Sequence, residues 1–344
     1  MMMKRVAAGI LAGLLSASLI AGCGGDSGKS SGGTAKPAAA STVSVPSRAP
    51  VSTPPTTTFK FGEHEAKVYE LKGVDAWKES RTNIGHLAVT KDAIYFHGKK
   101  RDGDPQQYLW KLSYNKEQLT AMEPVAPANG FEVLGTNGTE VYFRSNEKTL
   151  DVYDGKTLRK GKEWQADEMV GSSAANTKDI FFLKQGGVAK STADDTSKFD
   201  MVVKQIDANK ENIGGMDIVY ADGKEIYVRG NIRKQGAKVS TPTLLVFDMT
   251  GKEIRRYEGI EDTPRGWAVT ANYVVHASAK GMIRVFDRAT GSQIGEATLE
   301  LRPATGSQNG KEPAKLRPFQ FFTVTGNDVI MFDDKDNKFY RIDF

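Results

Sequence analysis

The chain contains one cysteine, Cys23, and four histidines among its 344 residues. A single cysteine excludes a disulfide framework and any metal site built from several thiolates. The histidines are His64, His86, His97 and His276, and no two of them have the spacing of a metal-binding pair. We therefore expect no metal, no cofactor and no catalytic residue, although the sequence leaves open a site assembled from distant residues.

An excess of charge of one sign is also lacking. The formal net charge is +5, and about +3 remains without Lys4 and Arg5 of the amino terminus. Domains that bind nucleic acid carry a larger and more clustered excess of Lys and Arg. We therefore expect no nucleic-acid partner. Hydrophobic residues make up 39% and charged residues 26% of the chain, which is ordinary for a folded domain with its own core.

A long hydrophobic run occurs only at the amino terminus, at Val6–Ile20. Its 15 residues fall short of the roughly 20 that span a membrane, and with the preceding Lys4 and Arg5 they have the form of a secretory signal. The run leads into Ile20-Ala21-Gly22-Cys23. This is the pattern of a lipobox, because small residues admit the signal peptidase and the thiol takes up a diacylglycerol. We predict that residues 1–22 are a lipoprotein signal peptide and that Cys23 is lipidated.

Residues 23–57 consist mainly of Gly, Ser, Thr, Ala and Pro. Such a segment buries too little hydrophobic surface to offset the entropy of ordering, so we expect a flexible linker with a reach of roughly 30 Å. The protein is then expected at the cell envelope, anchored to a membrane through Cys23. Gly24, where an aspartate would favour inner-membrane retention, favours the outer membrane in a cell with two membranes, at its periplasmic face or the cell surface.

The remaining residues, 58–344, contain a repeated pattern in which a turn rich in Thr, Asn, Asp or Gly leads into a short apolar and aromatic strand. The instances align on Ile94, Val141, Ile180, Ile226, Val274 and Val329, with spacings of 47, 39, 46, 48 and 55 residues. Within each repeat a second strand ends in a polar residue, which is usually followed by a turn. These residues are Ser113, Asp154, Asp207, Asp248, Asp287 and Asp343. Asp side chains bond the backbone of such turns, so we interpret them as structural.

Six repeats of this length, without helical periodicity, predict an all-β domain folded as a β-propeller of six blades, with seven left open by the uneven spacings. The last repeat reaches Phe344 without an outermost strand. We predict that residues 66–71 supply that strand and close the ring. Closure of this kind removes open sheet edges, and we expect the body to be monomeric.

The segments Leu244–Glu258 and Met282–Thr298 resemble PQQ-like and YVTN-type propeller repeats in their order of strand, Phe-Asp, turn, Thr-Gly and strand. Together with the lipobox, the layout is similar to the propeller-lipoprotein family of the outer-membrane β-barrel assembly machinery. That family has eight blades, and six are counted here. The resemblance implies a propeller body that binds or scaffolds other proteins of the envelope.

Two functions remain in view. The first is a membrane-anchored scaffold that binds an envelope protein through its loops, since loops on a rigid frame carry function in most folds. The candidate loops are Lys99–Gln107, Gly186–Lys198, Asn231–Thr243 and Arg302–Arg317. The alternative is a metal-dependent hydrolase or lactonase with its site at the channel of the propeller, a site that leaves almost no sequence pattern. We favour the binding protein over the enzyme.

Overall fold

A computed structural model describes most of the predicted body. The described residues are 55–74, 87–99, 106–115, 117–127, 133–146, 149–163, 179–192, 195–206, 212–233, 236, 238–259, 266–278, 281–299, 320–323, 328–333 and 338–344. The chain divides into two units, residues 1–51 and 52–344, and every described residue belongs to the second unit. The predicted signal peptide and Cys23 lie outside the described residues. Within the described part, no helix has the length and hydrophobicity needed to cross a bilayer.

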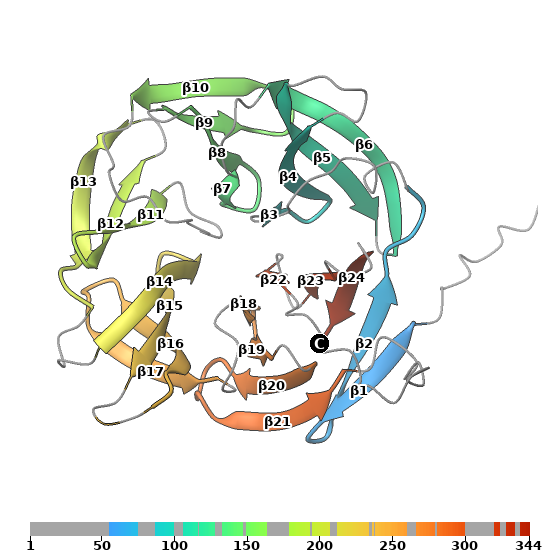
Figure 1. Ribbon diagram of the computed structural model, residues 1–344, viewed down its shortest axis with the longest axis vertical. Helices are drawn as coiled ribbons and strands as arrows, with labels where there is room; N and C mark the ends of the chain where they lie inside the picture. Colours follow the sequence, from blue (N-terminus) through green and yellow to red (C-terminus); the bar gives the residue numbers. More distant parts are fainter. Residues whose placement is uncertain are drawn as a thin grey trace, which may run out of the picture. The chain divides into compact units, whose positions relative to one another are not determined.

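The described strands form six antiparallel sheets that surround a centre as the blades of a propeller (Figure 1). Five blades have the following strands, given from the centre outward: blade 1, β3 (Leu87–Val89), β4 (Ala93–Lys99), β5 (Gln107–Asn115) and β6 (Gln118–Pro127); blade 2, β7 (Val133–Thr136), β8 (Val141–Asn146), β9 (Thr149–Tyr153) and β10 (Leu158–Glu163); blade 3, β11 (Asp179–Lys184), β12 (Gly187–Thr192) and β13 (Asp195–Val203); blade 4, β14 (Asn212–Ala221), β15 (Glu225–Arg233), β16 (Thr241–Asp248) and β17 (Glu253–Glu258); blade 5, β18 (Trp267–Val269), β19 (Tyr273–Ala277), β20 (Met282–Asp287) and β21 (Gln293–Thr298). The six-bladed fold predicted from the repeats is confirmed.

The core is divided into six hydrophobic clusters, and each cluster joins two neighbouring blades. The second strand of a blade shows the reason, because successive side chains of a strand point to opposite faces of its sheet. In β4, Ile94 packs in the cluster shared with blade 6, whereas Tyr95 packs in the cluster shared with blade 2. These strands are therefore apolar on both faces, which is why they appear in the sequence as short continuous apolar runs.

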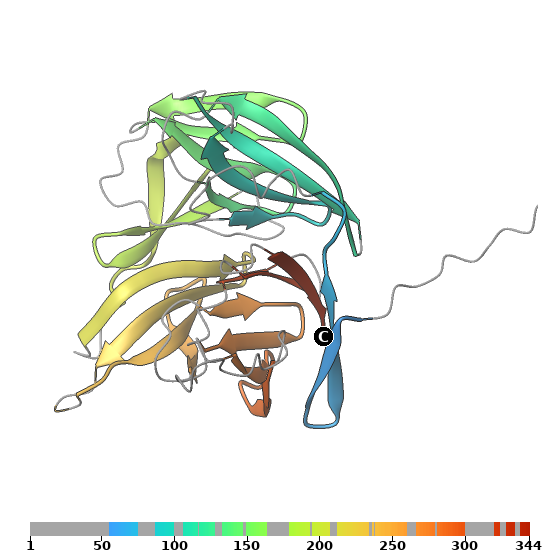
Figure 2. The same ribbon diagram turned by 45° about the vertical axis from the view of Figure 1, so that its right-hand side comes forward.

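Blade 6 combines the two ends of the described chain. Its inner strands are β22 (Gln320–Thr323), β23 (Asp328–Asp333) and β24 (Lys338–Asp343), and the fourth is β2 (His64–Glu70). β2 pairs antiparallel with β24, with Val68 opposite Ile342. The prediction that residues 66–71 close the ring is confirmed. The structure adds a fifth strand, β1 (Thr57–Phe61), which pairs with β2 and lies along the outside of the blade (Figure 2).

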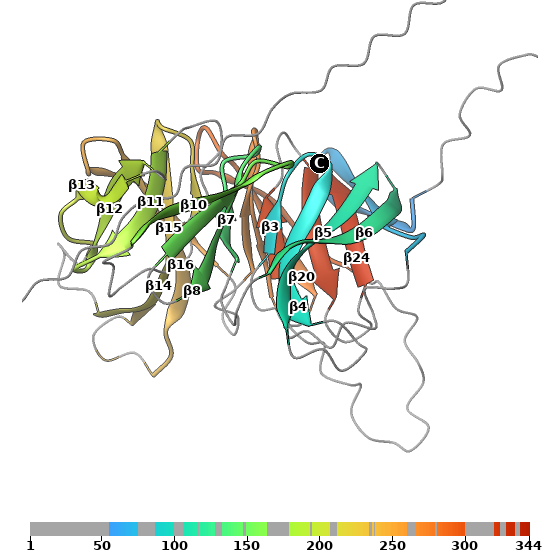
Figure 3. The same ribbon diagram turned by 90° about the horizontal axis from the view of Figure 1, so that it is seen from above.

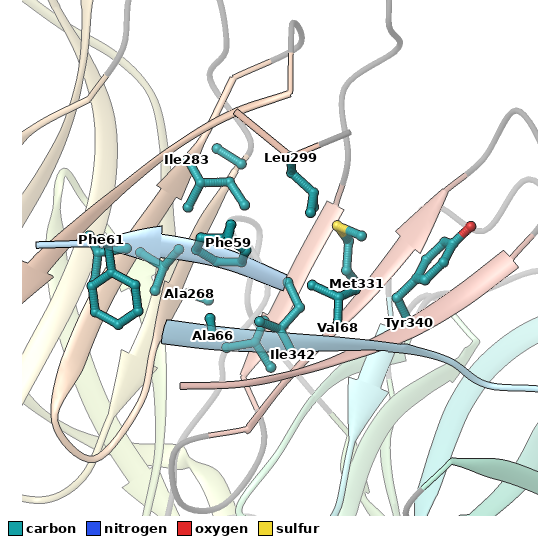
Figure 4. Close-up of a cluster of buried hydrophobic side chains, with 14 residues drawn as sticks. Phe59, Phe61, Ala66, Val68, Ala268, Ile283, Leu299, Met331, Tyr340 and Ile342 are labelled. Carbon is teal, nitrogen blue, oxygen red and sulfur yellow. The ribbon is translucent and has the colours of Figure 1, made fainter. Parts of the chain in front are cut away.

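Residues 57–72, the N-terminal clasp, tie three blades together. Phe59 and Phe61 of β1 are buried in the cluster that includes Ile283 of blade 5 and Ile342 of blade 6 (Figure 4). At the other end of the clasp, Lys72 exchanges backbone hydrogen bonds with the start of β6 in blade 1. The clasp therefore contributes hydrophobic burial to one joint of the ring and backbone pairing to the next.

The antiparallel order gives the ring two faces, between which the strands run (Figure 3). The turns between first and second strands, and between third and fourth strands, lie on one face, which we call the short-turn face. The strand ends that precede and follow the second-to-third connections, and those where the chain leaves one blade and enters the next, lie on the opposite face. The clasp enters β1 on the side of this opposite face, because Thr57 pairs with Val68 and the hairpin at Gly62 points the other way.

Candidate functional site

The three histidines in the described part of the chain lie far apart in the fold. His64 begins β2, His97 lies in β4 and His276 lies in β19, three strands of three different blades, and His86 is outside the described residues. His276 is fully buried, with its ring centroid 4.3 Å from that of Trp267. Among the described residues, no group of three His, Cys, Asp or Glu side chains could hold a metal ion. This part of the chain gives the metal-dependent hydrolase no support.

Three of the four predicted loops are flanked by strand ends on the opposite face. Lys99–Gln107 joins β4 to β5, Asn231–Thr243 spans the end of β15 and the start of β16, and Arg302–Arg317 falls between β21 and β22. Residues 100–105 and 302–317 lie outside the described residues. Residues far apart in the sequence thus flank a single face of the ring.

The fourth loop prediction, Gly186–Lys198, is wrong. Residues 187–192 form β12, which pairs with β11 and β13 in blade 3, and β13 begins at Asp195. The small residues of this segment suggested a loop, but Val188 and Ala189 are fully buried, and Ala189 pairs with Phe182 of β11. Small side chains are used here because they pack beneath large aromatic neighbours.

Blade 4 carries the hairpin that reaches farthest on the opposite face among the described residues. Counted from the aligned position, Ile226 in β15 and Val274 in β19, β15 continues to Arg233 whereas β19 ends at Ala277. Beyond β15, Val239 is 57% exposed and follows the exposed Lys238. Val239 is the most exposed large hydrophobic side chain among the described residues. An exposed apolar side chain beside cations, on a hairpin that extends from the sheet, is suited to protein contact.

The short-turn face is built on the repeated aspartates. Asp154 accepts hydrogen bonds from the backbone N–H groups of Lys156 and Thr157, and Asp248 and Asp287 bond the turns that follow them in the same way. The bonds from Thr157, first its N–H and then its hydroxyl, with that from Lys156, lower the pKa of Asp154 to about 2. Bonds from the following turns also lower the pKa values of Asp248 and Asp287. The structural interpretation is confirmed for these three residues.

Two other members of the series of strand-ending polar residues, Asp207 and Ser113, need correction. The strand register places Glu225 opposite Asp248 and Asp328 opposite Asp343. The position of the strand-ending polar residue, which we call the slot, therefore lies opposite the first residue of the second strand. In blade 3 the corresponding residue is Asp179, which precedes the aligned Ile180, and it pairs with Thr192 rather than with Asp207, which lies outside the described residues. In blade 1, Ser113 occupies the slot opposite Ala93, but β5 continues to Asn115, so no turn begins at Ser113.

An arginine that the repeat analysis missed joins blades 4 and 5. Arg288, just after the turn aspartate of blade 5, reaches back to Asp222 at 2.5 Å and Glu225 at 3.3 Å, and donates to the Tyr227 hydroxyl at 2.9 Å. Burial alone would raise the pKa of Asp222, but hydrogen bonds from the backbone of Glu225 and Lys224 and from Arg288 lower it. The network is a stabilising joint between two blades, and its acidic groups are all engaged.

The closing blade has a similar group with a different outcome. Arg341 lies 3.1 Å from the Asp328 carboxylate and 2.6 Å from that of Asp343, and its guanidinium is 4.9 Å from the ring centre of Tyr69 in the clasp. Burial is the largest cause of a raised Asp343 pKa, to about 7; a hydrogen bond and charge repulsion from Asp328 add to it, and Arg341 opposes it. This aspartate differs from the other three by its environment, although it occupies the same slot.

One sequence signal could have revealed these groups. The residue before the aligned position is acidic in four repeats, namely Glu140, Asp179, Glu225 and Asp328. Each has a cation within 4 Å: Arg159, Lys190, Arg255 and Arg341 respectively. The partners come from different strands, so only the acidic half of the pattern is periodic in the sequence.

The fold and these groups define a six-bladed β-propeller. No protein-family model and no curated protein matches the chain. Among solved structures, it is similar to U3-55K, at 12% identity and a TM-score of 0.44, over 77% of each chain. It is also similar to BamB from Moraxella catarrhalis, at 13% identity and a TM-score of 0.39, over 80% of this chain and 100% of that one. The WD40 propeller domain of Doa1 matches at 13% identity and a TM-score of 0.42, over 83% of this chain and 97% of that one.

Proposed function

We propose that the protein is a cell-envelope lipoprotein, anchored through Cys23, whose propeller binds another envelope protein with the opposite face of the ring. The lipobox at residues 20–23 supports the anchor. In a cell with two membranes, the anchor places the body at the outer membrane, at its periplasmic face or the cell surface.

The blade 4 hairpin carries the binding part of the proposal. Val239 exposes 57% of its surface, whereas the hydrophobic side chains of the second and third strands of this blade are buried. Exposing an apolar side chain at the end of an extended hairpin gains nothing for the fold, and a partner that covers it would gain the corresponding burial. Lys238, which precedes it, is exposed, and so is Arg233 at the end of β15, so the complementary surface is apolar with an acidic rim.

The anchor is tested by metabolic labelling with a radioactive or alkyne-bearing palmitate. We expect label on the wild-type chain and its recovery with membranes, because the thiol is the site of acylation. Cys23→Ala removes that thiol, so it should lose the label and the membrane association. Membrane-bound, labelled Cys23→Ala protein would overturn the assignment of Cys23.

The binding face is tested separately, with a photo-crosslinking amino acid placed at position 239 in cells. We expect one dominant adduct with an envelope protein, and its loss when Lys238→Glu is added. The same crosslinker at Lys156, an exposed turn residue of the short-turn face, is the matched control and should give none. Equal adducts at both positions, or none at 239, would contradict binding through the blade 4 hairpin while leaving the anchor result unaffected.

A further inference from the structure

Four aspartates occupy the same slot, at the end of the third strand of their blades, yet one of them behaves differently. Asp154, Asp248 and Asp287 are each followed by a turn whose N–H groups bond the carboxylate. Asp343 has no such turn, because the strand that pairs next to β24 is β2, from the other end of the described chain. The closing blade therefore leaves this carboxylate without the backbone donors that keep the others ionised.

The group that Asp343 meets instead is a second carboxyl. Asp328 stands opposite it across β23 and β24, and both carboxylates lie within 3.1 Å of the same Arg341 nitrogen. Two carboxyl groups that share one site repel each other when both are ionised, which favours a proton on one of them. Arg341 contributes one positive charge close to both. One arginine and one proton together neutralise the pair.

This pair lies directly against the N-terminal clasp. Lys67 of β2 is the register partner of Asp343, and Tyr69 is the partner of Arg341, whose guanidinium lies over its ring. We infer that closure of the ring is proton-sensitive: a proton shared by Asp328 and Asp343 holds β24 in place against the clasp, and the clasp loosens when that proton is lost.

Other ionisable groups around the pair come from each element packed against it. They are Arg341 of β24, Lys67 and Tyr69 of β2, and Asp92, Tyr114 and Glu117 of blade 1. The phenols of Tyr69 and Tyr114 have raised pKa values, first through burial, so both stay neutral near pH 7. Among the groups whose pKa values are shifted, Asp343 alone has a pKa near 7.

The sign of the effect follows from linkage. The pKa of Asp343 is raised above its ordinary value of 3.8 to about 7, so the folded ring binds the proton more tightly than the open chain does. The stabilisation is fully present below pH 3.8, declines as the pH rises through about 7, and is gone above that. Closure is therefore tighter in mildly acidic than in mildly alkaline surroundings.

Amide hydrogen exchange of the full chain between pH 5.5 and 8.5 tests the inference, with rates corrected for the intrinsic pH dependence of exchange. Protection of the β2 amides of residues 67–70 should fall roughly tenfold across this range, the equivalent of one pKa unit. Protection of β16 in blade 4 should stay constant. A flat profile for β2 would overturn the inference.

Substitutions separate the carboxyl pair from other causes. Asp343→Asn keeps a hydrogen bond to Asp328 without needing a proton, so its β2 protection should not change with pH. Asp287→Asn, in the same slot of blade 5, should keep the wild-type slope. His64→Gln should keep it as well, and it tests the histidine of the clasp, which stacks on Phe61. A slope that persists in Asp343→Asn, or disappears in His64→Gln, would contradict the role of the pair.

Discussion

Two joints of the ring each contain one arginine and two carboxylates, but in different surroundings. One lies between blades 4 and 5, and the other closes the ring. In the first, Arg288 lies 2.5 and 3.3 Å from Asp222 and Glu225. In the second, Arg341 lies 3.1 and 2.6 Å from Asp328 and Asp343. The pKa of Asp222 is lowered, whereas that of Asp343 is raised. An arginine between two carboxylates therefore does not decide their charge by itself.

Backbone donors make the difference. Asp222 begins a tight turn and accepts hydrogen bonds from the N–H groups of Lys224 and Glu225. Asp343 ends a strand whose next neighbour in the sheet comes from the N-terminal clasp, so no turn follows to supply donors. The way a ring is closed thus changes the chemistry of one residue in a repeated slot. A turn keeps the carboxylate ionised, and a remote strand leaves it to share a proton.

The largest effect is expected at the joint between blades 4 and 5. Arg288→Met should lower the free energy of unfolding by about 3 kcal/mol, because Asp222 would remain half-buried without its cation and Glu225 would keep only its contact with Arg255. Arg341→Met should cost about 1 kcal/mol at pH 6, where the shared proton still compensates the pair. Urea unfolding of both variants and the wild type measures the difference.

The same two variants test the difference between the joints at a second pH. At pH 8 the cost of Arg341→Met should grow, since the shared proton is then lost, and the cost of Arg288→Met should not change. Arg288→Lys is the matched control, because it keeps the charge but loses the hydrogen bonds to several partners. Equal costs for the two methionine variants at pH 6 would show that the proton does not compensate the closing pair.

An effect of similar size is expected from the hydrophobic part of the clasp. Phe61 is 1% exposed and its ring contacts those of Phe59, Tyr273 and Phe344. Phe61→Ala should cost about 3 kcal/mol or slightly less, the lower end for a buried phenylalanine. In this variant, amide hydrogen exchange should become faster only in β1, β2 and β24, because only these strands should open locally. Phe199→Ala is the control, because Phe199 is 39% exposed and its loss should cost below about 1 kcal/mol.

Much of this fold could be predicted from the sequence because its repeats are local. Each blade needs a short strand that is apolar on both faces, and such a run is visible wherever it occurs, as at Ile94 and Tyr95 or at Ile226 and Tyr227. The closing strand was also predictable, since the last repeat lacks an outer strand. β1 was missed because it is only five residues long and its first residue, Thr57, is the last of the Thr- and Pro-rich linker segment.

The polar joints were not predictable in the same way. Arg288 and Arg341 follow no common spacing from the acids they bind, because Arg288 crosses to another blade while Arg341 lies on the adjacent strand. The special behaviour of Asp343 depends on which strand lies beside β24, a property of the closed ring. The candidate binding face was predictable in part. Its loops could be named from the sequence, but that they flank the same face of the ring follows only from the strand order.

The smallest effect is expected from the cation–π contacts, which differ in number between the two joints. Among the described residues, Arg341 lies over one ring, that of Tyr69 at 4.9 Å, whereas Arg288 lies over two, Tyr220 at 5.0 Å and Tyr227 at 5.3 Å. Tyr69→Leu should cost about 0.5–1 kcal/mol, since it removes the ring but keeps much of the apolar contact. Tyr69→Phe keeps the ring and should unfold with the wild-type midpoint in urea. If the Phe variant is as weak as the Leu variant, the hydroxyl rather than the ring holds Arg341, and the closing joint depends on hydrogen bonding, as the joint at Arg288 does.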